Sequence, residues 1–238
     1  MTPIAILRVS IVLALTITLM PIYLLGLALD YLFGQRIVVL LINKFWSRAI
    51  MKTIGIKWEL VGLKSEAHIF VFNHISWIDI LAINSTIDVV FIAKKEVRSW
   101  PGLGILAVLG QPIFIERKSL NALSQKWAVE ECLKKGQSIF FFPEGTSTDG
   151  SIIKQFKSSL FEVCYGETFK EKILGSVQPL TIIYKSPIQN DPGFYSFWRE
   201  EDTIFENIKK SLRKYVKVGC GWYSINQLNL TNTVIESI

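Results

Sequence analysis

A histidine and an aspartate stand five positions apart, directly after an apolar run of the chain. His74 and Asp79 lie in residues 73–79, which follow the apolar residues 69–72, and the chain contains only one other histidine, His68. An imidazole can move a proton near neutral pH, and a carboxylate beside it can orient the ring and stabilise its cation. The spacing therefore predicts a catalytic loop at the end of a buried strand.

The same segment also allows a purely structural interpretation. Residues 76–79 place a serine three positions before an acid, a pattern that caps the start of a helix. On a continuous helix, residues five apart point about 140° away from each other. A direct contact between His74 and Asp79 therefore requires His74 to lie just outside the helix, where a cap at Ser76 places it. The two interpretations are compatible, because a cap can also fix the carboxylate that orients the imidazole.

The composition favours an anionic partner and a membrane surface. The chain has 238 residues, 50% of them hydrophobic, and a formal net charge of +6. The sequence has no zinc-ligand spacing, basic–aromatic repeat or block rich in lysine and arginine, so neither a metal site nor a nucleic-acid partner is expected. Its three cysteines, Cys132, Cys164 and Cys220, are scattered and odd in number. They indicate reduced structural residues in a cytosolic catalytic domain.

The N-terminal segment has the length and composition of a membrane-associated helix. Residues 9–29 form 21 positions without a charge, and a helix of that length covers about 30 Å, the thickness of one hydrocarbon core. A signal peptide is the alternative, although the run is longer than usual and no small-residue cleavage site follows it. Pro21 lies in the middle of the run, which leaves open a helix that enters a bilayer and stops part-way.

A second N-terminal helix carries a row of basic residues. Lys44, Arg48 and Lys52 recur every four residues and share one helix face. Such a helix can lie among lipid headgroups, or it can pack on the catalytic domain with a solvated basic edge. The excess of positive charge after the apolar run predicts that the body of the chain lies on the cytoplasmic side of the membrane. We expect membrane-anchoring helices over residues 1–53 and a catalytic domain over residues 54–238.

Short apolar runs alternate with helical patterns in this second part of the chain. The clearest helix covers residues 119–135, with Gly136 as its stop signal, and a basic amphipathic helix is predicted over residues 204–216. The alternation predicts an α/β fold with a mixed central sheet flanked by helices. A half-buried strand is expected over residues 56–61, and buried strands are expected over residues 68–72, 89–93, 112–115, 139–142 and 180–184.

Two further polar clusters follow predicted strands. Residues 110–117 end in Arg117, whose guanidinium is suited to holding a phosphate, although a surface arginine is the alternative. Residues 140–150 join an apolar strand to a proline, an acid, a glycine and several hydroxyls. Gly145 allows a ligand to approach the backbone, and the amides and hydroxyls can bind phosphate oxygens. An ordinary turn is the alternative for this second cluster.

In their order and spacing these segments resemble the motifs of the glycerolipid acyltransferase family, which includes bacterial 1-acyl-sn-glycerol-3-phosphate acyltransferases. The first family motif, N-H-x4-D, matches residues 73–79, and the second, a glycine and a short strand ending in arginine, matches residues 110–117. The third, F-P-E-G-T, matches residues 142–146, and the fourth, an apolar segment around a proline, matches residues 177–180. The resemblance covers about residues 56–185.

The resemblance implies transfer of a fatty acyl group from a thioester, acyl-CoA or acyl-carrier protein, to a hydroxyl of a lysolipid in the membrane. His74 would act as the base and Asp79 as its partner, so that no protein nucleophile, metal or redox cofactor is required. A Phe-Lys segment that follows the third motif in the family resembles the sequence around Lys157. The acceptor would be bound by Arg117, Glu144, Gly145, Thr146 and Lys157.

The leading acceptor that the resemblance implies is 1-acyl-glycerol-3-phosphate, whose sn-2 hydroxyl would be acylated to give phosphatidic acid in phospholipid biosynthesis. Ser147 stands where many family members have an arginine, and the run from Glu144 to Gly150 resembles acyltransferases that make ornithine lipid. Lyso-ornithine lipid or another lysophospholipid is therefore the alternative acceptor. A thioesterase, in which His74 activates water, and an inactive lipid-binding protein are the other classes. The intact set of motif residues argues against an inactive protein.

Overall fold

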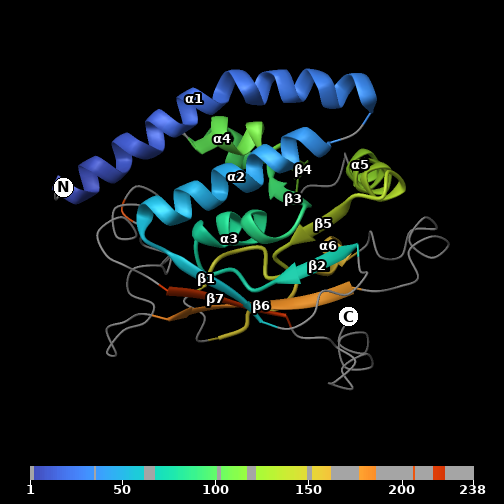
Figure 1. Ribbon diagram of the computed structural model, residues 1–238. Coiled ribbons are helices and arrows are strands. Elements are labelled where there is room, and N and C mark those ends of the chain that lie inside the picture. Colours follow the sequence, from blue (N-terminus) through green and yellow to red (C-terminus); the bar gives the residue numbers. More distant parts are fainter. Residues whose placement is uncertain are drawn as a thin grey trace.

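Helices and strands alternate along the chain, as the sequence predicts (Figure 1). The computed structural model describes residues 3–34, 36–61, 68–100, 103–116, 122–148, 152–161, 177–185, 206 and 217–222. The helices are α1 (Pro3–Phe33), α2 (Ile37–Ile54), α3 (Ile78–Thr86), the short 3₁₀ helix Lys95–Ser99, α4 (Leu103–Leu109), α5 (Ala122–Lys134) and α6 (Ser158–Phe161). The strands are β1 (Lys57–Val61), β2 (Ile69–Phe72), β3 (Val89–Lys94), β4 (Ile113–Ile115), β5 (Ser138–Phe141), β6 (Val177–Lys185) and β7 (Lys217–Trp222).

The seven described strands form one sheet in the order β1-β7-β6-β2-β5-β3-β4. β6 and β7 pair antiparallel, and all other neighbouring strands in this order pair parallel. The prediction of a mixed central sheet is therefore confirmed. Because β6, β2, β5, β3 and β4 run in the same direction, their carboxyl ends lie along one edge of the sheet. Open α/β sheets bind their ligands at that edge.

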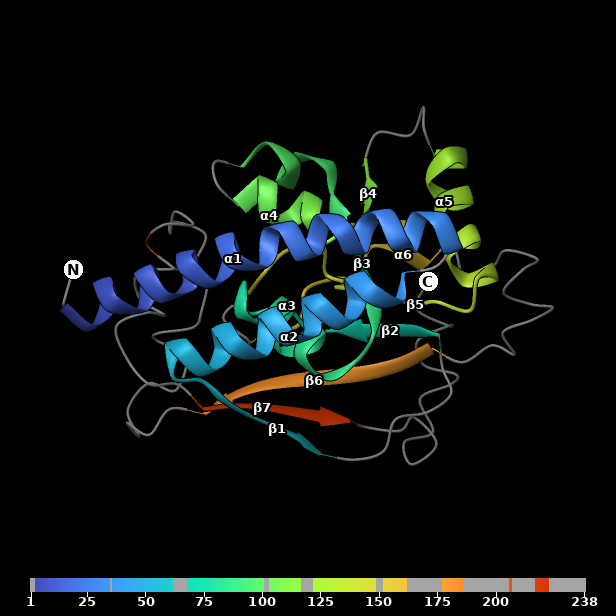
Figure 2. The ribbon, with the colours of Figure 1, turned by 45° about the horizontal axis from the view of Figure 1, so that its top comes forward.

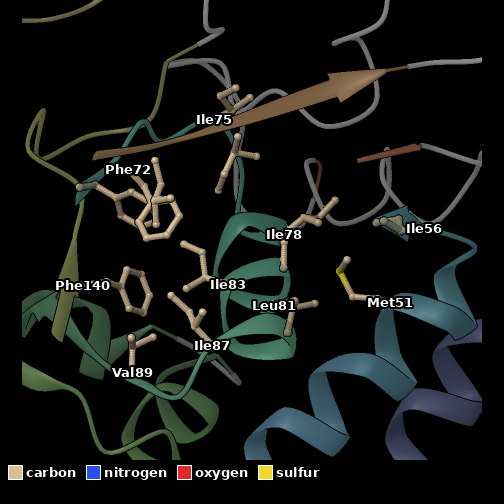
Figure 3. Close-up of a cluster of buried hydrophobic side chains, with 14 of the residues drawn as sticks. Met51, Ile56, Phe72, Ile75, Ile78, Leu81, Ile83, Ile87, Val89 and Phe140 are labelled. Carbon is tan, nitrogen blue, oxygen red and sulfur yellow. The ribbon is translucent and has the colours of Figure 1, made fainter. Parts of the chain in front are cut away.

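Alternate residues of the central strands pack into two separate hydrophobic cores. One core lies between the sheet and helices α2 and α3, where Figure 3 shows Ile83 of α3 pointing toward Phe72 and Phe140 of the strands. The other core includes Val71 of β2 and Leu133 of α5. Residues 70 and 72 thus belong to the first core and residues 69 and 71 to the second. Helices cover both faces of the sheet, as predicted.

The first two helices form an antiparallel hairpin that lies over α3 (Figures 1 and 2). The carboxylate of Asp30 in α1 accepts hydrogen bonds from the backbone N–H groups of Val38 at 3.0 Å and Val39 at 2.8 Å. A carboxylate in this position caps the first turn of α2 and interacts favourably with the positive end of the helix dipole. Further along the hairpin, the indole Nε1–H of Trp46 donates to Thr16 Oγ1 at 3.0 Å. These bonds fix α1 lengthwise against α2.

The outer side of α1 remains strongly apolar. The helix runs without interruption through Pro21, and among the described helices it is the one whose length and composition allow it to cross a membrane. Exposed apolar surface of this extent is typical of a face that contacts a membrane or another protein. The exposed large hydrophobic residues of α1 are Ile4, Ile6, Leu7, Ile11, Leu13, Ile17, Ile22, Leu24, Leu25, Tyr31, Leu32 and Phe33.

The basic row of α2 contacts the body of the protein. Lys44 Nζ lies 2.9 Å from Asp88 Oδ2, and Arg48 Nε donates to the carbonyl oxygen of Ser85 at 2.8 Å. Ser85 belongs to the last turn of α3, where a cation also interacts favourably with the negative end of the helix dipole. Of the two interpretations that the sequence leaves open, packing on the catalytic body is therefore the one seen for Lys44 and Arg48.

The C-terminal part of the chain contains a strand that the sequence does not predict, and a predicted helix that lies almost entirely outside the described residues. Strand β7 was not predicted, because its sequence contains Gly219 and Gly221 and lacks the continuous apolar run of a buried strand. It is nevertheless placed between β1 and β6. The helix predicted over residues 204–216 lies outside the described residues apart from position 206.

Cys132 is expected to resist labelling in the folded protein. This residue of α5 is 6% exposed, and its thiol donates to Gln137 Oε1 at 3.2 Å. Burial raises the pKa of the thiol to about 11, so that little reactive thiolate exists at pH 8. A variant with alanine at Cys164 and Cys220 should react with a thiol reagent at pH 8 only after unfolding. Rapid labelling of the folded variant would contradict the buried position of Cys132.

Candidate active site

The loop that follows β2 is fixed to the neighbouring strand β6 by an asparagine side chain. Asn73 Nδ2 donates to the carbonyl oxygen of Ile182 at 3.0 Å, and the backbone N–H of Ile182 donates back to Asn73 Oδ1 at 2.8 Å. The amide side chain therefore continues the ladder between the two strands beyond the end of β2. This pair of bonds sets the direction in which the chain leaves the sheet, just before His74.

His74 and Asp79 are in direct contact. His74 Nδ1 lies 2.8 Å from Asp79 Oδ2, and the two side chains are 18% and 0% exposed. Helix α3 begins only at Ile78, so His74 lies outside the helix, as a direct contact requires. The contact places an imidazole beside a carboxylate at the carboxyl edge of the sheet, where the chain enters α3 from β2.

The Asp79 carboxylate is surrounded by hydrogen-bond donors. Its Oδ2 accepts from the backbone N–H of Ile75 at 2.7 Å and of Ser76 at 2.9 Å, in addition to its contact with His74. Its Oδ1 accepts from the hydroxyl of Tyr184 in β6. The bond from Ser76 is the one expected for the acid of a capping box. The cap residue of α3 is however Trp77 and not Ser76, and the Asp79 N–H donates to the Ser76 carbonyl oxygen instead of its hydroxyl, so the predicted box is only half formed. Four donors satisfy a carboxylate that is buried away from water.

This arrangement selects one tautomer of the neutral imidazole. An ionised carboxylate can only accept hydrogen bonds, so His74 Nδ1 carries the proton that lies between the ring and Asp79. His74 Nε2 is then left with a lone pair on the side of the ring turned away from Asp79. The side chain of His74 is partly accessible. An imidazole in this state can accept a proton from a bound hydroxyl.

His74 is held in place by a phenyl ring and a backbone hydrogen bond, both from the segment that follows the adjacent strand β5. The ring of Phe142 is stacked on the His74 ring, with centroids 3.9 Å apart and an interplanar angle of 9°. Phe142 follows β5 directly, and the backbone N–H of Thr148 donates to the carbonyl oxygen of His74 at 2.8 Å. The two segments that match the first and third motifs are therefore adjacent in the fold.

The segment after Phe142 forms a tight turn. Gly145 has a φ of 65°, which a glycine adopts without strain. Glu144 is buried, and its Oε2 accepts from the backbone N–H of Lys154 at 3.0 Å. The carbonyl oxygen of Pro143 accepts from the backbone N–H of Lys157 at 2.8 Å. These bonds hold residues 154–157 against the turn.

A cleft of about 440 Å³ lies beside this turn. Lys94, the last residue of β3, contributes to it together with residues from the turn and from the segment that follows. Three lysine side chains and one glutamate give the lining a net positive charge, which favours an anionic ligand. The lining residues are Lys94, Glu144, Thr146, Lys154, Gln155 and Lys157.

Most of the residues predicted for the site occur in these two adjoining places. His74 and Asp79 form the contact, while Glu144, Thr146 and Lys157 line the cleft. Arg117 lies outside the described residues, so its place in the site stays a prediction. Among the described residues, no group of three or more histidine, cysteine, aspartate or glutamate side chains lies close enough to hold a metal ion.

Sequence reasoning missed the Tyr184 hydroxyl and two of the lysines, Lys94 and Lys154. In the sequence, Tyr184 is only the last residue of an apolar run, although a buried phenol requires a hydrogen-bond partner. That requirement is a signal that could have marked the residue. The lysines gave no signal, because their position depends on how strands β3 and β5 are placed side by side.

A solved structure has a similar fold. The crystal structure of the 1-acyl-sn-glycerophosphate (LPA) acyltransferase PlsC from Thermotoga maritima aligns with a TM-score of 0.55 and 16% identity. The alignment covers 92% of this chain and 85% of the other. At this identity the similarity concerns the fold alone.

Relatives with two different names match the chain. A Lyso-ornithine lipid O-acyltransferase from Rhodobacter capsulatus is 36% identical over 155 residues, which cover 64% of this chain and 55% of the relative. A 1-acyl-sn-glycerol-3-phosphate acyltransferase from Neisseria meningitidis is 35% identical over 120 residues, which cover 48% of this chain and 47% of the relative. The chain thus spans about half the length of these relatives.

The model of one protein family matches the central part of the chain. The match covers residues 62–182, about half of the 238 residues, and the family is described as Acyltransferase. The matched range contains the contact between His74 and Asp79 as well as the turn around Gly145. The chain therefore belongs to the acyltransferase family.

Proposed function

We propose that this protein transfers a fatty acyl group from a thioester to a hydroxyl of a lysolipid, with His74 as the general base. The observation that carries the proposal is the 2.8 Å contact between His74 Nδ1 and the buried carboxylate of Asp79 at the carboxyl edge of the sheet. This contact leaves Nε2 of the imidazole as the proton acceptor. The donor is acyl-CoA or an acyl-carrier protein.

The reaction needs a single base. His74 Nε2 takes the proton of the acceptor hydroxyl while that oxygen attacks the thioester carbonyl carbon. The tetrahedral intermediate then collapses, the carbon–sulfur bond breaks, and the imidazolium returns its proton to the departing thiolate. General base catalysis of this kind contributes about 10²- to 10⁴-fold to the rate. Asp79 stabilises the imidazolium, and the stacked Phe142 holds the plane of the ring.

The positively charged cleft is the proposed site of the acceptor headgroup. Glu144, Thr146 and Lys157 line it, and Gly145 forms the turn beside it. The lysines can bind the phosphate of lysophosphatidic acid or the carboxylate of an ornithine headgroup. A buried glutamate in the same lining fits a headgroup that also carries an ammonium. Arg117 is proposed as a further ligand of the anion.

Lyso-ornithine lipid is the acceptor that we favour. Ser147 replaces the arginine expected in the third motif of many family members, which weakens the case for a phosphomonoester. The match to the Rhodobacter capsulatus relative also covers more of this chain than the match to the Neisseria meningitidis relative. Lysophosphatidic acid, the acceptor that the sequence alone favours, is the second candidate, because the lining carries three lysines beside one glutamate.

A parallel assay of the two acceptors tests the proposal. The purified protein in lipid vesicles would receive labelled oleoyl-CoA with lyso-ornithine lipid, with lysophosphatidic acid, or with no acceptor. Acylated ornithine lipid as the main product supports the favoured acceptor, and phosphatidic acid alone supports the second candidate. Release of free fatty acid at the same rate in all three samples would identify a thioesterase and overturn the proposal.

Replacing Lys157 with alanine should weaken acceptor binding selectively. The lysine lines the cleft, so its loss is expected to raise the acceptor KM about tenfold while the thioester KM changes less than twofold. Lys126→Ala is the matched control, because this lysine lies on α5, outside the cleft lining, and its ion pair to Glu130 is long at 3.9 Å. Equal changes in both KM values for Lys157→Ala would show that the cleft does not bind the acceptor.

The apolar face of α1 is proposed to keep the site at the membrane that contains the acceptor. An acyl chain then remains in lipid while its headgroup enters the cleft, which avoids the transfer of the chain into water. The predicted orientation, with the catalytic body on the cytoplasmic side, is part of the same proposal. Cleavage by a protease added to sealed spheroplasts would contradict this orientation.

A further inference from the structure

Strand β6 holds the candidate active site at two points. Ile182 exchanges two hydrogen bonds with the Asn73 side chain, and two residues further on the Tyr184 hydroxyl donates to Asp79 Oδ1. We infer that Tyr184 is a positioning residue that acts on His74 through Asp79. The inference rests on the proposed function, since it assigns a role in the same reaction.

The register of the sheet explains how a residue so distant in sequence reaches the site. Leu180 of β6 lies opposite Phe72, the last residue of β2, so β6 continues for five residues past the end of β2. This extension runs beside the loop that carries His74. Ile182 and Tyr184 are two positions apart on one strand and therefore lie on the same face of the sheet, where both are buried.

The hydroxyl controls the direction of the carboxylate. The torsion about the Cβ–Cγ bond of an aspartate is soft, so one oxygen can turn unless the other is held. Oδ2 of Asp79 receives three donors, whereas Oδ1 accepts the hydroxyl of Tyr184. With Oδ1 anchored, Oδ2 remains in line with His74 Nδ1.

A purely structural role for Tyr184 makes a different prediction. A tyrosine that only fills the core would change the amount of folded protein, without altering the bond between His74 and Asp79. The two roles are distinguishable because the proton on His74 Nδ1 reports that bond directly by NMR. The chain contains only two histidines, so His68→Gln leaves a single imidazole in the spectrum.

The test is Tyr184→Phe in the full-length His68→Gln protein. The expected result is a fall in kcat of about tenfold, with both KM values within twofold of the parent. The His74 Nδ1–H resonance should move upfield, because a carboxylate that can turn makes a weaker bond to the imidazole. Tyr23→Phe is the matched control, since the Tyr23 hydroxyl is buried and has no hydrogen-bond partner among the residues that the structure describes. That control should leave both kcat and the resonance unchanged.

A second variant keeps the inference testable if Tyr184→Phe does not fold. Tyr184→3-fluorotyrosine retains the ring and makes the hydroxyl a stronger donor. It should therefore hold Oδ1 more firmly and move the His74 resonance downfield instead. An unmoved resonance together with an unchanged kcat in the folded variants would overturn the positioning role. Normal acyl transfer by His74→Ala would instead overturn the proposed function itself, so the two failures are distinguishable.

Discussion

His74→Ala is expected to lower the rate of acyl transfer at least 10²-fold, up to about 10⁴-fold, because it removes the base that accepts the hydroxyl proton. The loss should occur in kcat, with little change in the KM values, since the imidazole interacts with the reacting atoms mainly in the transition state. Initial rates with saturating thioester and lysolipid would measure the effect.

The control for this variant is His68→Gln, which removes the other histidine and should retain normal transfer. Binding of His74→Ala to lipid vesicles should equal that of the parent, because the apolar face of α1 lies outside the substitution. Transfer by His74→Ala at close to the parent rate would contradict the assignment of the base. Loss of vesicle binding would instead indicate a damaged fold.

The parts of the fold that follow from local pattern could be predicted from the sequence. Residues 69–72 and 139–142 are continuous apolar runs because both faces of those central strands are covered, and they form β2 and β5 at nearly those bounds. β7 was missed because a strand with two glycines is held by its neighbours, β1 and β6, and not by its own propensity.

In the candidate site, too, some contacts follow from local sequence and others depend on which strands are neighbours. The contact between His74 and Asp79 follows from six residues of sequence, since a helix that starts after His74 turns the carboxylate back toward it. The bonds from β6 to Asn73 and Asp79 join residues more than 100 positions apart. They depend on which strand lies beside β2, and apolar periodicity does not specify that order.

The basic face of α2 shows why a charge pattern alone could not separate two interpretations. A row of lysine and arginine on one helix face is equally suited to lipid headgroups and to the end of another helix. Lys44 and Arg48 contact Asp88 and the last turn of α3. The choice between the two partners depends on how α2 crosses α3, which is a property of the packed core and not of the helix itself.

Asp79→Asn should reduce both the rate and the stability, because an amide cannot replace this carboxylate. Four donors point at Asp79, and an asparagine has only one acceptor oxygen. The NH₂ group of the asparagine would face at least one of these donors and could not accept its hydrogen bond. A buried donor left without an acceptor lowers the free energy of unfolding by about 1–3 kcal/mol. The imidazole would also lose the anion that stabilises its cation and selects its tautomer. In a serine-protease triad the same substitution lowers kcat about 10⁴-fold, and we expect a loss of about 10³- to 10⁴-fold here.

Asp88→Asn separates this effect from the loss of any negative charge near α3. Asp88 is about half exposed and pairs with Lys44, and an exposed ion pair contributes about 0–1 kcal/mol. Asp88→Asn should therefore keep full transfer and nearly the parent melting temperature, whereas Asp79→Asn loses transfer and melts several degrees lower. If Asp79→Asn melts lower but transfers at the parent rate, Asp79 is only a helix cap. If it loses transfer with an unchanged melting temperature, the four hydrogen bonds stabilise the reacting histidine more than the fold.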